Sequence, residues 1–272
     1  MPKDTPVSPL PEQQTLKGVR TVLRAKGLVK SFNRRTVVNG IDIEVRTGEV
    51  IAFLGRNGAG KTTTFHMIAG LLKPDSGSIH LDDSDISRYT SPQRAKVGIT
   101  YLPQESSVFL KTSVENNLRM VLEFSGRKKK DVKKIAAELL KELGLSDLAR
   151  QSAHSLSGGE RRRLEICRAL VLDPKFLLLD EPFTGIDPLT TIDLQKIIIR
   201  LRSRGIGIIL SDHNVRDTLQ ITNRAYLIDE GEILIQGTPR EVTADETARE
   251  LFLGKGFRLG EEISAHSSEE NR

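Results

Sequence analysis

Two adjacent carboxylates end an apolar run in the stretch FLLLDEP, Phe176–Pro182. An apolar run of this length is typical of a strand that is buried on both faces. Asp180 and Glu181 would then lie at the end of a buried strand, where an uncompensated carboxylate is strongly unfavourable. The pair therefore predicts a cation or several hydrogen-bond donors at this strand end.

A phosphate-binding motif precedes the pair in the chain. The stretch EVIAFLG leads into GRNGAGKTT, which fits the pattern G-x-x-x-x-G-K-[ST]. Glycines let the backbone point its N–H groups at phosphate oxygens, and the helix that begins near Gly60 adds the positive end of its dipole. We expect Lys61 to reach the β- and γ-phosphates and the Thr62 hydroxyl to bind Mg²⁺. The nucleotide-binding residues predicted in this loop are Gly55, Arg56, Asn57, Gly58, Ala59, Gly60, Lys61, Thr62 and Thr63.

The phosphate loop assigns chemistry to the two carboxylates. Asp180 is expected to hold the Mg²⁺ of a bound nucleotide through a water molecule, because Mg²⁺ keeps most of its waters and takes only one or two carboxylates. Glu181 is then free to orient and deprotonate the water that attacks the γ-phosphate. The alternative for both residues is a hydrogen-bonded surface turn. Open α/β sheets bind their ligands at the carboxyl ends of strands, which favours the first interpretation.

A second anion site is predicted in the stretch LSGGE. Ser157 and Glu160 fit a capping box that opens a helix, which is the simplest interpretation. A capping box does not require Gly158 and Gly159, and glycine is unfavourable in a first helical turn. Two glycines leave backbone N–H groups free to bind a phosphate. Two copies facing head to tail could each sandwich an ATP between this stretch and the other copy's phosphate loop, as a two-fold homodimer permits.

Strand and helix signals alternate along the chain and must position these residues. Strand signals lie in TVLRAKGLVKSF, IDIEV, EVIAFLG, GSIHLDD, VGITYLP, KFLLLD, GIGIILSD and RAYLID. A helical section, roughly Thr112–Leu172, interrupts them, with Thr112 and Glu115 as a candidate capping box and Gly126 and Gly144 as helix stops. The alternation predicts a parallel sheet flanked by helices, with the helical section as a subdomain on one side.

The composition is that of a globular chain with a mild basic excess. Of 272 residues, 38% are hydrophobic and 28% charged, and the formal net charge is +5. This excess suits an anionic ligand or a membrane surface but is too small to indicate nucleic acid. The single cysteine, Cys167, excludes an intrachain disulfide, and no apolar window approaches the ~18 residues of a membrane span. We expect no metal cluster at four further histidines, His66, His80, His154 and His266.

In their order and spacing, these motifs resemble those of the nucleotide-binding subunits of ABC transporters, over about residues 22–259. The resemblance adds Gln104 in YLPQ, Asp187 in GIDP, His213 in SDHN and Phe32 in VKSFNRRTVV. It implies that Gln104 links the γ-phosphate and Mg²⁺ to a membrane partner and that Asp187 contacts the opposite subunit. It also implies that His213 holds the γ-phosphate and that Phe32 stacks on adenine. Taken alone, Phe32 could be a strand core residue and His213 a core or cap residue.

Within the family, the chain is most similar to the branch that powers lipopolysaccharide export. The similar stretches are YLPQESSVF, LSGGERRRLEICRAL, DEPFTGIDP, SDHNVRDTL and FLGKGFRL. The resemblance implies that Phe109 helps to form a groove for two membrane partners, although Phe109 alone could be a core residue. It also implies that Leu251–Leu259 packs near a two-fold axis. The chain departs from the branch at Arg56, where a proline is usual, and at Leu110–Lys111, where a more basic pair is usual.

The resemblance implies an α/β fold: a P-loop NTPase core with a mixed or parallel sheet, an antiparallel β subdomain and an α-helical subdomain. We expect a disordered extension at residues 1–20, the nucleotide-binding domain at 21–260 with its helical subdomain at about 105–172, and a disordered tail at 261–272. The predicted protein is a Mg²⁺-dependent ATP hydrolase. It forms a homodimer and binds no nucleic acid. It lies in the cytoplasm, attached through two integral membrane subunits to the inner membrane.

Three alternative functions remain open from the sequence. A branched-chain amino-acid type importer ATPase has similar motifs, and its membrane partner would differ. A soluble ABC protein that acts on ribosomes or DNA usually has two such domains or a long coiled coil, whereas this chain has one domain and no sustained heptads. A non-catalytic nucleotide-binding scaffold is disfavoured by the presence of Glu181 and His213.

Overall fold

The computed structural model describes residues 20–124, 128–254 and 257 of the chain. Of the predicted N-terminal extension only Arg20 is described, and the whole of the predicted tail 261–272 lies outside the described residues. Among the helices in these described ranges, none combines the length and apolar character needed to cross a bilayer.

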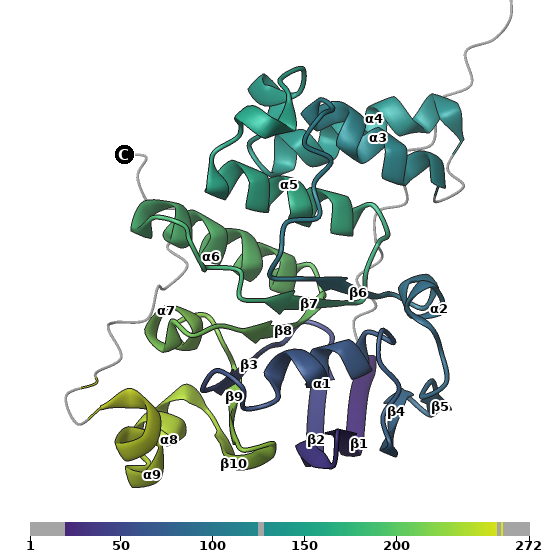
Figure 1. Ribbon diagram of the computed structural model, residues 1–272. Helices are drawn as coiled ribbons and strands as arrows, with labels where there is room; N and C mark the ends of the chain where they lie inside the picture. Colours follow the sequence, from purple (N-terminus) through teal and green to yellow (C-terminus); the bar gives the residue numbers. More distant parts are fainter. Residues whose placement is uncertain (1–19, 125–127, 255–256, 258–272) are drawn as a thin grey trace, which may run out of the picture.

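A central sheet of six strands runs through the molecule (Figure 1). Its strands are β3 (Val50–Gly55), β6 (Ile99–Leu102), β7 (Phe176–Asp180), β8 (Gly207–Ser211), β9 (Arg224–Asp229) and β10 (Glu232–Gly237). Their order in space is β10-β9-β3-β8-β7-β6, with β10 antiparallel to β9 and all other pairs parallel. The five parallel strands were predicted from their apolar runs. β10 was not predicted, because its apolar run is only three residues long, Ile233–Ile235, and every second side chain along the strand is exposed.

A second sheet of four antiparallel strands lies beside the central one (Figure 1). Its strands are β1 (Val22–Phe32), β2 (Arg35–Arg46), β4 (Ser76–Leu81) and β5 (Ser84–Asp85), in the order β2-β1-β4-β5. The turn between β1 and β2 places Asn33 and Arg34 at positive φ, 47° and 67°. This sheet confirms the predicted antiparallel β subdomain.

The helices of the described chain that lie outside the helical subdomain pack against the sheets. They are α1 (Lys61–Ile68), α2 (Ser91–Lys96), α6 (Pro188–Ser203), α7 (Val215–Leu219), α8 (Pro239–Ala244) and α9 (Glu246–Ala248), followed by a π-helical turn at Arg249–Leu253. α1 follows β3, α6 follows β7 and α7 follows β8. Because these strands are parallel, the loops that enter α1, α6 and α7 lie at one edge of the sheet.

A helical subdomain is inserted between β6 and β7 and forms the top of the molecule in Figure 1. It contains α3 (Val114–Phe124), α4 (Lys129–Glu142) and α5 (Gly158–Leu170), with short 3-10 helices at Ser146–Leu148 and Ala153–Ser155. Gly144 follows α4 at a φ of 68°, as predicted for a helix stop, whereas Gly126 lies outside the described residues. The predicted capping box at Thr112 and Glu115 is wrong by one position. The Ser113 hydroxyl accepts the Asn116 N–H (3.2 Å), because α3 begins only at Val114.

Two apolar clusters sandwich the central sheet, and β7 contributes to both. Leu177 and Leu179 pack with α5 and α6, whereas Phe176 and Leu178 pack on the opposite face with α1. All four side chains are fully buried. Since side chains alternate along a strand, the side chain of Asp180 belongs to the face that α1 covers.

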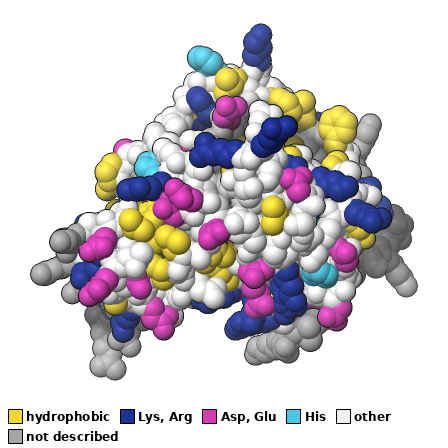
Figure 2. Space-filling view, turned by 60° about the horizontal axis from the view of Figure 1, so that its bottom comes forward, with side chains coloured by type: hydrophobic (Ala, Val, Ile, Leu, Met, Phe, Trp, Pro, Cys, Tyr) yellow, Lys and Arg dark blue, Asp and Glu magenta, His cyan; other side chains and the backbone are white. Residues whose placement is uncertain are grey.

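The surface carries both charges in mixture. On the face shown in Figure 2, basic and acidic side chains are interspersed, with some apolar side chains between them. This agrees with 41 Lys and Arg residues against 36 Asp and Glu in the whole chain.

Candidate active site

The loop between β3 and α1 has the tight backbone that the phosphate motif predicts. A Cβ atom at Gly55 would lie 2.4 Å from the Ile228 carbonyl oxygen, and one at Gly60 would lie 2.6 Å from the Val37 carbonyl oxygen. Gly60 also has a φ of 102°, which side chains rarely tolerate. The loop backbone therefore packs tightly against β9 on one side and against β2 on the other.

The Lys61 ammonium lies over this loop. Its Nζ donates hydrogen bonds to the carbonyl oxygens of Gly55 (2.7 Å) and Arg56 (3.0 Å). Lys61 is buried, and burial lowers its pKa, which nearby Glu181 and Asp180 partly restore. The buried Lys61 ammonium is therefore close to the carboxylates of Asp180 and Glu181. The sequence predicted a cation at this strand end, and Lys61 supplies one.

Asp180 is held from both neighbouring strands. It is 1% exposed. Its Oδ1 accepts the Ser211 hydroxyl of β8 (2.5 Å), and its Oδ2 accepts the Tyr101 hydroxyl of β6 (3.1 Å). Burial raises the pKa of Tyr101, so its hydroxyl stays protonated and able to donate. The alternative of a surface turn is wrong for Asp180.

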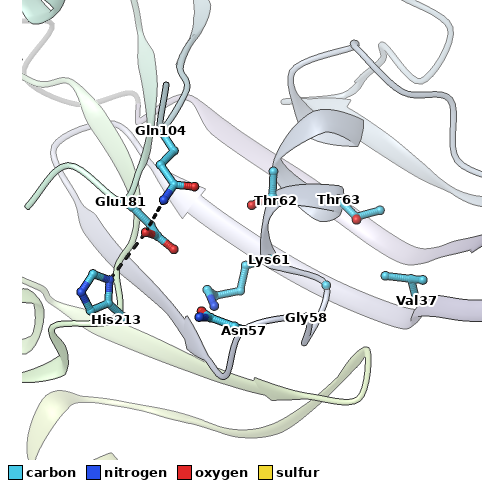
Figure 3. A pocket seen from close by; sticks show the side chains of 10 residues that line it. Val37, Asn57, Gly58, Lys61, Thr62, Thr63, Gln104, Glu181 and His213 are labelled. Atoms are coloured by element: carbon cyan, nitrogen blue, oxygen red, sulfur yellow. Dashed lines mark hydrogen bonds and ion pairs between the residues drawn. The ribbon is translucent and has the colours of Figure 1, made fainter. Parts of the chain in front are cut away.

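Glu181 follows with a φ of 46°, an uncommon conformation for a residue with a side chain. Its N–H donates to the Ser211 carbonyl oxygen (2.8 Å). Its Oε2 accepts hydrogen bonds from Gln104 Nε2 (2.8 Å) and Thr184 Oγ1 (3.0 Å) and lies 3.6 Å from His213 Nδ1. Figure 3 shows Gln104, Glu181 and His213 in contact on one side of a cavity and Lys61 on the other.

This cavity has a volume of about 490 Å³. It is lined by Val37, Asn57, Gly58, Gly60, Lys61, Thr62, Thr63, Gln104, Glu181 and His213. All except Val37 were predicted, although they come from four separate parts of the sequence. The fold thus brings a phosphate loop, a buried lysine and a carboxylate that could accept a proton from water to one cavity.

His213 is positioned by the end of β8. Its side chain is 58% exposed, and Nδ1 lies 3.4 Å from Thr184 Oγ1 and 3.6 Å from Asp212 Oδ1. Asp212 is buried and accepts the N–H groups of Phe183 (2.9 Å) and Asn214 (2.8 Å). Burial raises the pKa of Asp212. The alternative role of His213 as a core or cap residue is wrong, since Asn214 caps α7.

The donors near the end of β7 fit Mg²⁺. Asp180, Thr62 and Gln104 supply carboxylate, hydroxyl and amide oxygens, which are hard ligands that Mg²⁺ prefers. Each Asp180 oxygen accepts one protein hydrogen bond and keeps lone-pair capacity for a metal-bound water. In the part of the chain that the structure describes, no group of three or more His, Cys, Asp or Glu residues could hold a metal ion. The residues present therefore fit an ion that brings water and phosphate oxygens as its other ligands.

The stretch LSGGE opens α5 as a capping box. The Ser157 hydroxyl accepts the Glu160 N–H (3.3 Å), and Glu160 Oε2 accepts the Ser157 N–H (2.8 Å). Ser157 and Gly158 are exposed, whereas Gly159 is buried. A Cβ at Gly159 would lie 2.0 Å from Thr190 Cγ2 of α6. Packing within one chain therefore explains Gly159, and only Ser157 and Gly158 are displayed to the outside.

Comparison with known proteins decides the family. The model of the ABC transporter family matches residues 38–184, more than half of the chain, from β2 to the turn that follows Glu181. The chain belongs to the ABC transporter family. It binds and hydrolyses ATP as a subunit of such a transporter, as the motifs predicted.

Individual proteins are similar over most of the chain. The lipopolysaccharide export system ATP-binding protein LptB of Acidithiobacillus ferridurans is 48% identical over 238 residues, 88% of this chain and 99% of that protein. LptB of Escherichia coli strain K12 is 46% identical over 241 residues, 87% of this chain and 99% of that protein. The ADP conformation of MJ1267, an ATP-binding cassette of an ABC transporter, has a TM-score of 0.78 at 26% identity, covering 86% of this chain and 99% of that one. The predicted fold class is confirmed.

Several predicted residues of this ABC transporter ATPase lie outside the main cavity lining. They are Phe32, Gly55, Arg56, Ala59, Phe109, Ser157, Gly158, Gly159, Asp180 and Asp187. Gly158 instead lines a cavity of about 130 Å³ together with Gln104 and Glu181. The capping end of α5 therefore lies close to the carboxylate at the end of β7.

Phe32 and Phe109 are exposed aromatic residues. Their exposed fractions are 45% and 46%, so the alternative of a core phenylalanine is wrong for both. The Phe109 ring lies 4.7 Å from the Arg168 guanidinium, and the Phe32 ring lies 5.7 Å from Lys30 Nζ. Leu110 beside Phe109 is 38% exposed, which gives this ABC transporter ATPase an apolar surface patch next to the helical subdomain.

Asp187 and Arg56 make contacts within the chain. Asp187 caps α6: its Oδ1 accepts the Thr190 N–H (3.0 Å) and its Oδ2 the Thr190 hydroxyl (2.5 Å). The Arg56 guanidinium lies 5.9 Å from the Phe252 ring. Phe252, Leu253 and Phe257 pack on the β3–β9 side of the core. Of the predicted segment Leu251–Leu259, only residues 251–254 and 257 are described.

Sequence reasoning missed residues that support the site from below. Tyr101 and Ser211 bind Asp180. Arg162, a buried residue of α5, donates to the carbonyl oxygens of Asp180 (3.0 Å) and Pro103 (3.1 Å) and pairs with Glu165 (2.7 Å). The only signals in the sequence were a serine directly before Asp212 and a run of three arginines, Arg161–Arg163, in an amphipathic helix.

Proposed function

We propose that the chain is the ATP-hydrolysing subunit of a transporter that extracts lipopolysaccharide from the inner membrane and exports it toward the outer membrane. The lipopolysaccharide part is supported by relatives of that name at 46–48% identity, matched over 99% of their length. The ATPase part is supported by one observation: Lys61 and Glu181 line the same cavity.

ATP would bind with its phosphates in the loop Gly55–Thr63 and its adenine against Phe32. Lys61 would neutralise the β- and γ-phosphates, and the backbone of Asn57 and Gly58 would supply N–H donors. Asp180 (through water), Thr62 and Gln104 would hold Mg²⁺. When bound, the ion would supply positive charge beside the phosphates.

Glu181 would act as the general base. Its carboxylate is fixed by Gln104 and Thr184 at one side of the cavity, so it can hold and deprotonate a water placed beside the γ-phosphate. His213 lies 3.6 Å from the same carboxylate and would hold the γ-phosphate. Its side chain is 58% exposed, so a ligand in the cavity can reach the ring.

A homodimer would complete the site. Ser157, Gly158 and Gly159 of a second copy would face the γ-phosphate, and Asp187 would contact that copy near the shared nucleotide. The exposure of Ser157 and Gly158 supports this arrangement. The burial of Gly159 against Thr190 limits the directly displayed part to the first two residues.

Two integral membrane subunits would bind at the patch of Phe109 and Leu110. Gln104 lies a few residues upstream of this patch and donates a hydrogen bond to Glu181. Movement of the segment between Gln104 and the patch would therefore reach the Glu181 carboxylate. We place the protein peripherally on the cytoplasmic face of the inner membrane, without nucleic acid as a partner.

The test is purification of the native membrane complex through a tag on this chain. We expect two integral membrane proteins to copurify. In liposomes, the complex should move lipopolysaccharide to an acceptor in an ATP-dependent manner. The Glu181→Gln complex is the control, because it should assemble but release no lipopolysaccharide. Copurification of an amino-acid importer permease, or ATP-driven uptake of amino acids, would contradict the proposal.

A further inference from the structure

The Asp180 carboxylate is oriented by two hydroxyl groups from two different strands. Ser211 of β8 binds Oδ1 and Tyr101 of β6 binds Oδ2. A carboxylate turns easily about its Cβ–Cγ bond, because this torsion has broad minima. With one donor, the carboxylate can still rotate about that single hydrogen bond. Donors on both oxygens fix the plane of the carboxylate. Tyr101 therefore supplies the contact that completes the orientation of Asp180.

Tyr101 is itself held by the helix that follows the phosphate loop. Its ring makes edge contacts with Phe65 (centroids 6.3 Å apart, interplanar angle 84°) and His66 (5.5 Å, 87°), both from α1. These packed rings fix the position of the phenol. The hydroxyl is thus delivered to Asp180 from a rigid support.

The hydrogen bonds of the Tyr101 hydroxyl have one consistent direction. An ionised carboxylate only accepts hydrogen bonds, so Tyr101 donates its single proton to Asp180. His66 Nε2 lies 3.2 Å from the same hydroxyl oxygen. Because that oxygen has already used its proton, Nε2 must be the donor in this contact. His66 therefore carries its proton on Nε2 and strengthens the bond from Tyr101 to Asp180.

The chain His66–Tyr101–Asp180 connects three parts of the site. His66 belongs to α1, which begins with Lys61 and Thr62. Tyr101 lies on β6, three residues before Gln104. We propose that Tyr101, supported by His66, is a positioning residue that aims Asp180 at the nucleotide-bound Mg²⁺. This inference rests on the proposed function, because it needs Asp180 to face the metal.

The test separates metal binding from nucleotide binding. The dissociation constant of AMP-PNP, an ATP analogue that is not hydrolysed, is measured by calorimetry with Mg²⁺ and with EDTA. The ratio of the two constants gives the gain in affinity that the metal provides. Substitution of a residue that orients a metal ligand typically lowers the metal affinity about 10- to 100-fold. We expect Tyr101→Phe, which removes only the hydroxyl, to lower the gain about 10-fold. Affinity in EDTA should stay within about twofold, since the phosphate loop is untouched.

Tyr226→Phe is the matched control. Tyr226 is 2% exposed, and its hydroxyl is bonded to Arg224 (3.0 Å) and Glu44 (3.3 Å), outside the set of residues around Asp180. Tyr226→Phe also removes a hydrogen-bonded phenol hydroxyl, so it controls for general loss of stability. The metal-dependent gain should remain at the wild-type value.

Two substitutions test the support from α1. His66→Leu removes the donor to Tyr101, and we expect it to lower the metal-dependent gain about threefold, less than loss of the hydroxyl itself. His66→Gln offers an amide N–H and should restore the gain. A structural role alone would not be rescued in this way.

An unchanged gain in Tyr101→Phe overturns the inference and leaves the proposed function intact. If the wild-type protein shows no gain from Mg²⁺, the metal assignment of Asp180 fails, and the inference fails with it. An equal loss in Tyr101→Phe and Tyr226→Phe also overturns the inference, because it would show a general effect of buried hydroxyl loss.

Discussion

The carboxyl end of β7 and the amino end of α5 are both expected to meet ATP, yet they are built differently. Asp180 is 1% exposed and bonded from β6 and β8, and Glu181 is held by Gln104 and Thr184. At α5, Ser157 and Gly158 are exposed and Ser157 is satisfied by its own capping box.

The difference shows which half of the site a single chain completes. At β7, hydrogen bonds within the chain fix side chains before any ligand arrives, so substitutions there should act on the chemical step. At α5, the helix end is stable by itself, and in the proposed homodimer it would face a second copy. Substitutions there should act on assembly or on helix packing.

The largest effect is expected from Glu181→Gln. The amide keeps the shape of the side chain but cannot accept a proton from water. General-base catalysis typically contributes about 10²- to 10⁴-fold, so steady-state phosphate release should fall by at least about 100-fold. ATP binding should persist because Lys61 and the loop are unchanged. Titration with a fluorescent ATP analogue measures it.

Glu230→Gln is the matched control for this change. Glu230 also has a φ of 46°, and it is exposed in the turn between β9 and β10. The same chemical change at the same backbone conformation should leave phosphate release unaltered. Phosphate release near the wild-type rate in Glu181→Gln would exclude Glu181 as the base.

The β7 end could be predicted from the sequence because its signals are local. An apolar run followed by two acids, and a glycine pattern ending in Lys61, each lie within about ten residues. The family was predicted from these patterns together with LSGGE and the order and spacing of the other motifs, and the family and the fold class are confirmed by the comparisons. The roles of individual site residues and the domain limits stay predictions.

The α5 end was harder because its explanation lies elsewhere in the chain. Gly159 was assigned to phosphate binding together with Gly158, but its missing side chain makes room for Thr190, 31 positions later. Tyr101 was likewise an ordinary residue within a strand pattern until the fold placed its hydroxyl against Asp180. Contacts between distant segments leave no local pattern to detect.

A second prediction uses the two glycines to separate packing from assembly. Gly159→Ala would place a Cβ 2.0 Å from Thr190 Cγ2, and Thr190 cannot turn away without losing its bond to Asp187. Overpacking of this kind costs about 1–3 kcal/mol, measured as the free energy of unfolding in urea. Gly158→Ala meets only ordinary contacts, 3.6 Å from the Gly185 carbonyl oxygen, and should leave stability unchanged.

The same pair should behave differently in dimer formation. Gly158→Ala adds a methyl group to the exposed helix end, so we expect Mg-ATP-dependent dimerisation of the Glu181→Gln protein to weaken about 10-fold, or about 1.4 kcal/mol. Analytical ultracentrifugation measures this directly. Full dimerisation of the Gly158→Ala protein would argue that α5 does not face a second copy.

The smallest effect concerns the charge in the capping box of α5. Hydrogen bonds from the Ser157 N–H and then its hydroxyl lower the pKa of Glu160. A carboxylate with a lowered pKa in the folded state stabilises the fold above its unfolded pKa, and this stabilisation is lost as pH falls through the folded value. Because Glu160 is partly exposed to solvent, its contribution should be about 0.5 kcal/mol or less.

Glu160→Gln removes this titration but keeps the cap, since glutamine also serves at the third position of a capping box. Urea unfolding at about pH 7 should give nearly equal stabilities for the two proteins, whereas between about pH 5 and pH 3 the wild type should lose more stability than the variant. Parallel pH curves would mean that the Ser157–Glu160 bonds do not persist in solution. The α5 end would then lack the internal order that separates its role from that of the β7 end.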